Sequence, residues 1–188
     1  MDDAVFLEVA EYLRSNNLRR AVDRLVAYEA GKLAPRGLGI DWRDANVAVG
    51  LTETITAIFA ARPRIIGSID EPGLNKLRVH ASLIELFGIG KIPGRFTLGS
   101  SGVGRMDADA AARMLLFYVQ SQADLAKWAK TESIVRRCEI SVCSDACEPC
   151  ATRDGQNYRL DEAPELPCPD CAHKMGCRCI YLAVLEDD

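Results

Sequence analysis

Apolar residues recur at three- and four-residue steps through most of the first 137 residues, which is the spacing of one face of an α-helix. Polar cap-forming residues, Gly and Pro separate these stripes. Asp44 and Asp107 are suited to cap helices, and Pro72 fits a first helical turn. The pattern predicts helices over residues 5–13, 18–26, 44–59 and 72–87. It predicts a longest helix from Asp107 towards Arg137, where Arg136 and Arg137 would oppose the helix dipole.

The pattern changes after residue 137. Short alternating or β-branched runs over residues 139–142, 157–160 and 180–184 predict strands, separated by an Asp-Gly turn and Pro-rich segments. About fifty residues are too few to build a large core. Small domains of this size usually need disulfide bonds or bound metal ions for stability. The expected fold is therefore mainly α: a helical domain over residues 1–137, followed by a small zinc-stapled α+β domain over residues 138–188.

Composition places the chain among soluble globular proteins. It has 188 residues, of which 48% are hydrophobic and 27% are charged. No apolar run approaches the ~20 residues of a membrane span, so we expect no membrane partner. The sequence begins Met-Asp-Asp-Ala, which is acidic where a leader would be basic, and this predicts a cytoplasmic location.

Charge is distributed unevenly. Residues 62–105 carry seven Lys and Arg against three Asp and Glu, a net charge of +4, whereas residues 138–188 carry four against eleven, a net charge of −7. Binding to a phosphate backbone depends on Lys and Arg, so residues 62–105 are the candidate DNA-binding segment.

All eight cysteines fall after residue 137. Cys147-Glu-Pro-Cys150 is followed, after seventeen residues, by Cys168-Pro-Asp-Cys171. This is the spacing of two knuckles that direct four thiolates at one tetrahedral Zn²⁺. The predicted metal ligands are Cys147, Cys150, Cys168, Cys171, His173, Cys177 and Cys179. With Cys143 the potential donors number eight, enough for two four-coordinate sites, and one site with spare thiols is equally compatible.

Three other interpretations of the cysteine pattern are alternatives to a zinc site. Disulfides need an oxidising compartment, an iron-sulfur cluster usually has more compact spacings, and a redox Cys-x-x-Cys normally opens a helix in a βαβ unit. A thiolate-saturated zinc is closed and structural, whereas catalytic zinc keeps an open position. No cleft with perturbed acids or bases is evident from spacing, so we expect a protein that is not an enzyme.

Several short motifs add a resemblance. Ala129-Lys-Thr-Glu132, Cys147-Glu-Pro-Cys150, Asp154-Gly155 and Gly176-Cys177-Arg-Cys179 resemble the C-terminal region of the phage Mu F-like head morphogenesis family. Members of that family often end this region with His-Pro-Asn-Cys-Arg-Cys. Here His173 lies four residues before Cys177, and the Pro-Asn pair is missing. The resemblance implies a minor head component of a virion, with capsid or portal proteins as partners. The resemblance also implies that Cys147, Cys150, Cys177 and Cys179 correspond to the zinc ligands of that family.

A glycine-rich segment follows the fourth predicted helix. Residues 83–98 look like a helix-hairpin-helix, in which Gly88 and Gly90 would let backbone N–H groups approach a DNA phosphate while Lys91 and Arg95 add charge. Pro93 and the glycines after it leave little length for a second helix. We therefore expect a structural or interaction protein that binds zinc, with a DNA-binding module as the alternative. His80 is expected to be a core or boundary residue.

Overall fold

The computed structural model describes residues 2–37, 39–88, 91–92, 106–130 and 135–185. Its longer helices fall where the apolar stripes predicted them. They are α1 (Asp3–Arg14), α2 (Leu18–Ala30), α3 (Ala45–Ala60), α4 (Glu71–Phe87) and α5 (Ala108–Ala129), with a short 3-10 turn η1 (Arg64–Ile66) between α3 and α4.

Aspartate side chains cap four of these helices. Asp44 accepts the Asn46 N–H at 2.9 Å and Asp107 accepts the Ala110 N–H at 2.7 Å, as the sequence predicted. Asp2 and Asp70 cap α1 and α4 in the same way. Each carboxylate satisfies an N–H group that has no partner inside its helix and lies at the positive end of the helix dipole.

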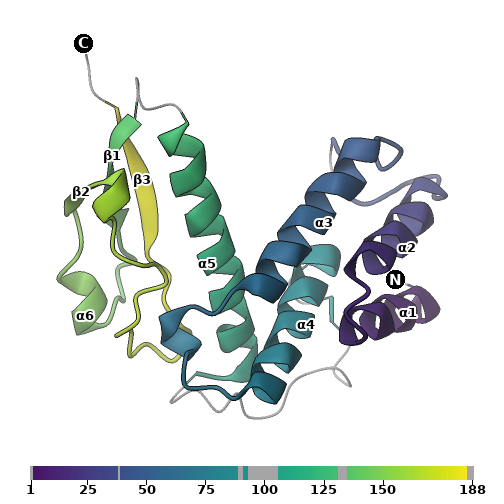
Figure 1. The fold of residues 1–188 in the computed structure, drawn as a ribbon, viewed down its shortest axis with the longest axis horizontal. Helices are drawn as coiled ribbons and strands as arrows, with labels where there is room; N and C mark the ends of the chain where they lie inside the picture. The colour runs from purple at the N-terminus through teal and green to yellow at the C-terminus, as the bar shows by residue number, and fades with distance from the viewer. Residues whose placement is uncertain (1, 38, 89–90, 93–105, 131–134, 186–188) are drawn as a thin grey trace.

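The first four long helices pack side by side, and α5 packs against α4 and α3 (Figure 1). The buried faces are the predicted apolar stripes, including Phe6 and Leu13 of α1 and Ile55 and Ile58 of α3. The Phe6 ring from α1 lies 5.0 Å from the Phe87 ring of α4, measured between centroids. This contact joins the beginning of the chain to the end of the fourth long helix.

The longest helix is shorter than expected. Helix α5 ends at Ala129, and strand β1 (Val135–Ser141) has already begun two residues before Arg137. The prediction that Arg136 and Arg137 oppose the dipole of this helix is therefore wrong. Both arginines lie on the strand, because Val135, Cys138 and Ile140 supply apolar side chains that the sheet buries.

The three strands predicted in the C-terminal segment pair as an antiparallel sheet. Strand β1 lies between β2 (Asn157–Arg159) and β3 (Ile180–Leu185), giving the order β2-β1-β3. Two short helical turns, α6 (Glu148–Ala151) and η3 (Leu160–Glu162), lie in the connections. Ile140 pairs with Tyr181, and both are buried in the hydrophobic core that also includes Leu115 of α5.

Two contacts fasten the C-terminal segment to the helices. The Cys177 N–H donates to Met114 Sδ of α5 at 3.2 Å. The Glu165 carboxylate accepts the Arg64 backbone N–H at 2.7 Å and also pairs with the Arg64 guanidinium at 3.1 Å. The molecule is thus mainly α, with a small α+β part near its C-terminus that shares one core with α5. Among the described residues, none of the helices combines the length and hydrophobicity needed to cross a membrane.

Candidate metal centre

Two backbone turns present the cysteine pairs. Cys147 stands at the N-cap of α6, and its carbonyl accepts the Cys150 N–H at 2.9 Å. In the second pair the Cys168 carbonyl accepts the Cys171 N–H at 3.1 Å. Both pairs therefore lie on tight backbone turns, and the thiols of the first pair, Cys147 and Cys150, lie in one close group.

The turns bring together thiols that lie far apart in the sequence. Cys147 and Cys171 have their sulfur atoms 3.7 Å apart, and Cys150 and Cys177 have theirs 4.0 Å apart. The ligands of a tetrahedral ion with metal–sulfur bonds of ~2.3 Å would be roughly 3.8 Å apart, whereas a disulfide bond is ~2.05 Å long. All eight cysteines are free thiols in the structure. The separations fit a metal ion and not a covalent bond.

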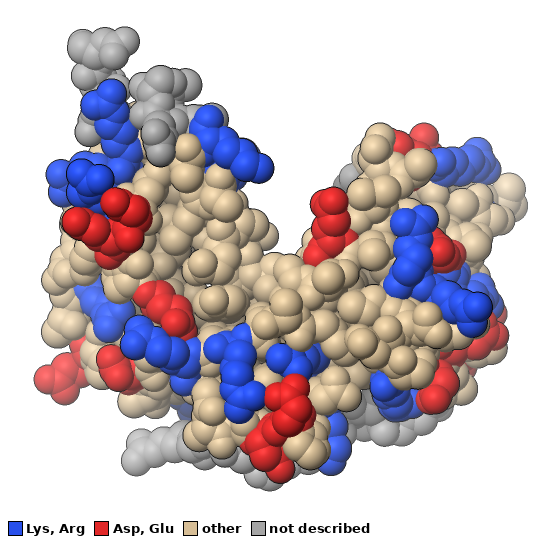
Figure 2. Space-filling view, in the orientation of Figure 1, with Lys and Arg blue, Asp and Glu red and all other residues tan. Residues whose placement is uncertain are grey.

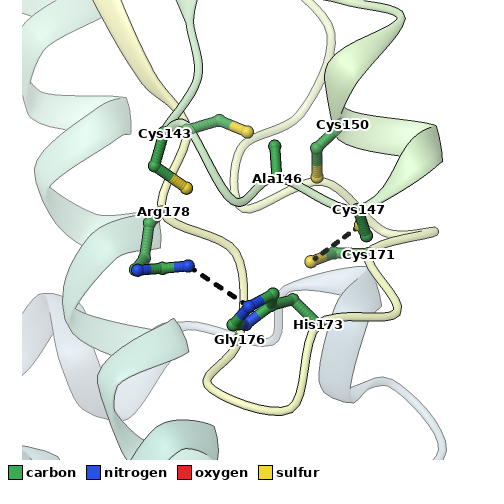
Figure 3. Close-up of a pocket in the computed structure, with 9 residues that line it drawn as sticks. Cys143, Ala146, Cys147, Cys150, Cys171, His173, Gly176 and Arg178 are labelled. Atoms are coloured by element: carbon green, nitrogen blue, oxygen red, sulfur yellow. Dashed lines mark hydrogen bonds between the residues drawn. The ribbon is translucent and has the colours of Figure 1, made fainter.

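A small cavity lies among these thiols. It has a volume of about 10 Å³, and its lining includes Cys147, Cys150, Cys171 and Cys179 (Figure 3). A space of this volume admits about one water-sized atom. Cys150 and Cys179 are buried, and Cys147 and Cys171 are partly exposed. The clustered cysteines are thus suited to hold a metal ion, because sulfur ligands surround a space of atomic size.

Peptide N–H groups point at two of the sulfur atoms. The Ala172 N–H donates to Cys147 Sγ at 3.3 Å, and the Cys168 N–H donates to Cys177 Sγ at 3.2 Å. Donors of this kind stabilise negative charge on sulfur and fix the direction of its lone pairs. They favour the thiolate form that a metal requires.

The thiols also compete for negative charge. Hydrogen bonds from Cys171 and Cys179 lower the pKa of Cys177 strongly, although burial opposes this. Burial raises the pKa of Cys150, and the neighbouring Cys177 raises it further. Contact with Cys177 likewise raises the pKa of Cys171 and of Cys179. One thiolate thus suppresses ionisation of its neighbours, and a divalent cation would remove that penalty because it neutralises several thiolates together.

His173 lines the cavity but lies outside the close groups of thiols. Its Nδ1 accepts the Met175 N–H at 3.1 Å, which assigns the ring proton to Nε2. That atom is 3.5 Å from Asp145 Oδ2 and 3.3 Å from Arg178 Nη2. Both ring nitrogens of this predicted ligand are therefore engaged beside the thiols.

Asp145 forms an ion pair with Arg178, which lines the cavity. Arg178 donates to Asp145 at 2.6 Å, and this hydrogen bond, together with one from the Cys143 thiol, lowers the pKa of Asp145 to about 2. Cys143 also lines the cavity. Cys138 lies apart from it, fully buried on β1 opposite Tyr158 and Ala183.

The larger hollow on the surface has a different character. A groove of about 470 Å³ lies between α3 and α5 and is lined by four alanines together with Arg62, Tyr118, Val119 and Gln122. Figure 2 shows the molecule hollowed between these two helices. The described residues of its lining include no carboxylate, histidine or thiol, so they add no metal ligand to the site.

The predicted DNA-binding loop lies largely beyond the described residues, which include Gly88 and Lys91 but not Gly90 or Arg95. Gly88 ends α4 with a φ of 92°, and its N–H donates to the Ile84 carbonyl at 2.7 Å. This is the role of a helix-terminating glycine.

His80 is a buried residue, as expected, and its Nε2 lies 3.4 Å from Asp109 Oδ1.

Sequence reasoning missed two residues that position the thiols, Met114 and Gly176. Met114 accepts the Cys177 N–H from a helix more than sixty residues earlier in the chain. Gly176 adopts a φ of 78° and packs against Met114 so closely that a Cβ there would lie 2.4 Å from Met114 Cε. The only local signal was the position of Gly176 directly before Cys177. The methionine gave none, because it lies on an ordinary apolar stripe.

Comparisons with known proteins add no assignment. No family model, no curated protein and no solved structure matches this chain.

Proposed function

We propose that the C-terminal segment binds zinc as a structural ion, and that the protein is a structural or interaction component and not an enzyme. The observation that carries the proposal is the cavity of atomic size lined by Cys147, Cys150, Cys171 and Cys179. Sulfur-rich sites favour zinc among the common divalent cations of cells.

The zinc would act by holding the C-terminal segment in one conformation. Apart from the clustered cysteines, the segment buries few large side chains, among them Ile140, Leu166 and Tyr181. Such a small core cannot offset the conformational entropy of ordering about fifty residues. Binding of a structural zinc contributes to folding free energy directly. Because Cys177 contacts Met114, an ordered cluster would also anchor the sheet on α5.

A site whose coordination positions can all be filled by thiolates favours a structural role over catalysis. Thiols surround the cavity, and the adjacent histidine and aspartate are engaged with each other and with Arg178. A catalytic zinc requires an open coordination position and a base placed to activate water. The resemblance to head morphogenesis proteins supports a role in virion assembly, in which the rigid C-terminal segment would contact a capsid or portal protein.

Metal analysis of purified protein, combined with thermal melting before and after chelation, tests the zinc proposal. We expect bound zinc and a lower melting temperature after chelation. Acidification should also release the metal, because protons compete for the thiolates. Cys147→Ser should contain less zinc than the wild type, whereas Cys138→Ala should keep the wild-type zinc content, because Cys138 lies in the sheet core away from the cavity. Protein without metal, or a melting curve insensitive to chelator, would contradict the proposal.

The assembly role needs a separate experiment. If portal or capsid genes neighbour this gene, co-expression with them should give a complex that survives size-exclusion chromatography. The Cys147→Ser variant should form less of that complex. If no portal or capsid gene lies near this gene, the proposed role in virion assembly has no support. The zinc proposal is unaffected by that outcome.

A further inference from the structure

The thiols gather as two groups of three. Cys147, Cys150 and Cys171 form one group, and Cys150, Cys177 and Cys179 form the other. Within each group all sulfur atoms lie within 4.8 Å of one another. Cys150 belongs to both groups, so the cluster has a shared sulfur and two outer pairs.

This arrangement differs from that of a single four-thiolate ion. With metal–sulfur bonds of ~2.3 Å, no two sulfur ligands of one ion are more than about 4.6 Å apart. A mononuclear site therefore needs four thiols that are all close to one another. Across the described cysteines the close groups contain three members each, and each resembles three corners of a separate tetrahedron.

The remaining thiols supply the missing corners. Cys168 is fully buried, its thiol hydrogen-bonds with Cys150, and its N–H donates to Cys177 Sγ. It therefore adjoins the second group. Cys143 also lines the cavity and is the cavity-lining thiol that belongs to neither group. Because Cys168 already adjoins the second group, Cys143 is assigned to the first. Two four-coordinate ions need eight metal–ligand bonds, and seven thiols provide eight when Cys150 is counted for both ions.

We propose that the C-terminal segment holds two divalent metal ions joined by the Cys150 thiolate, an inference that rests on the proposed zinc binding. One ion takes Cys143, Cys147, Cys150 and Cys171. The other takes Cys150, Cys168, Cys177 and Cys179. Six-cysteine clusters that hold two zinc ions are an established arrangement in small DNA-binding modules, where they serve as scaffolds. The shared sulfur would couple the two Cys-x-x-Cys turns to the Cys177-Arg-Cys179 segment.

The metal content of the wild-type protein is the first test. Native mass spectrometry and elemental analysis of the full chain should give two zinc ions per chain. One ion would overturn the two-ion cluster and leave the proposed zinc site standing. No ion would contradict both, so the two failures are distinguishable.

The bridge is tested by replacing zinc with ¹¹³Cd. We expect two cadmium resonances that are coupled to each other, because a shared thiolate transmits spin coupling between the ions. A single resonance, or two uncoupled resonances, would overturn the assignment of Cys150 as a bridge. This measurement uses the wild-type protein, so it does not depend on whether a variant folds.

Variants then assign the ligands. Cys147→Ser should weaken the binding of one ion, and Cys179→Ser should weaken the binding of the other. Each variant should therefore retain one ion in native mass spectra. Cys150→Ser should lower the affinity for both ions, and the control Cys138→Ala should retain two. A Cys150→Ser protein that still binds two ions with wild-type affinity would refute the shared ligand.

Discussion

Gly176 offers a sharp test of how the cysteine segment docks on α5. Its φ of 78° lies in the left-handed region, and a Cβ added there would lie 2.4 Å from Met114 Cε and 2.8 Å from Met114 Sδ. Met114 is fully buried, so its side chain has little space into which to move. Gly176→Ala should therefore strain the backbone and also push the segment away from the helix.

The two costs can be estimated separately. A Cβ in the left-handed region costs roughly 1–2 kcal/mol. An additional methyl group in a packed core costs roughly 1–3 kcal/mol. Gly176→Ala should therefore lower the free energy of unfolding by about 2–5 kcal/mol. Gly155 has a φ of 69° but nothing within 4 Å of the position a Cβ would take, so Gly155→Ala should show the backbone cost alone.

The assay is equilibrium urea unfolding at a fixed free zinc concentration, because metal binding itself shifts the apparent stability. The difference between the two glycine variants measures the clash with Met114. A Met114→Ala background should reduce the cost of Gly176→Ala to roughly that of Gly155→Ala, and the double-mutant cycle reports the coupling. Equal losses in the two glycine variants, or no coupling to Met114, would refute the proposed packing.

Two further predictions concern carboxylates. Hydrogen bonds from Lys32 and from the Arg36 N–H lower the pKa of the buried Glu29 even though burial raises it. Its stabilising contribution is therefore present above the unfolded pKa of about 4.3 and is lost as the pH falls through the lower folded pKa. The stability of Glu29→Gln, measured by urea unfolding against pH, should change less over this acidic range than that of the wild type, and parallel curves would contradict the ion pairing. Glu165→Ala should cost about 0.5–1.5 kcal/mol because it removes the hydrogen bond to the exposed Arg64 N–H, whereas Arg64→Ala retains that backbone bond and should cost less than about 0.5 kcal/mol in the same assay.

Local patterns were sufficient to predict most helices and the thiol cluster. The apolar stripes of the first four long helices carry their own start and stop residues, and Asp44 and Asp107 cap helices as predicted. Two Cys-x-x-Cys pairs predict two turns that each present a pair of thiols, because the geometry of such a turn depends on neighbouring residues only. These features depend on contacts within a few residues, and the sequence displays such contacts directly.

Features that depend on distant residues were not predictable in the same way. Arg137 follows a helical run, yet it lies on β1 because the strand pairs with residues 157–159 and 180–185. His173 lines the cavity with the thiols, and its contact with Asp145, twenty-eight residues earlier in the chain, forms only in the folded protein. Nothing near these positions in the sequence signals either outcome.

The sequence by itself determined that the chain has helices with an apolar face and a later segment rich in thiols, because periodicity and short spacings encode local geometry. Only the tertiary structure decided which thiols lie close together and that Cys150 lies in both groups. It also decided that Met114 of α5 accepts the Cys177 N–H. Those outcomes depend on the packing of a sheet against a helix, in which van der Waals contact and hydrogen-bond geometry select partners that are many residues apart.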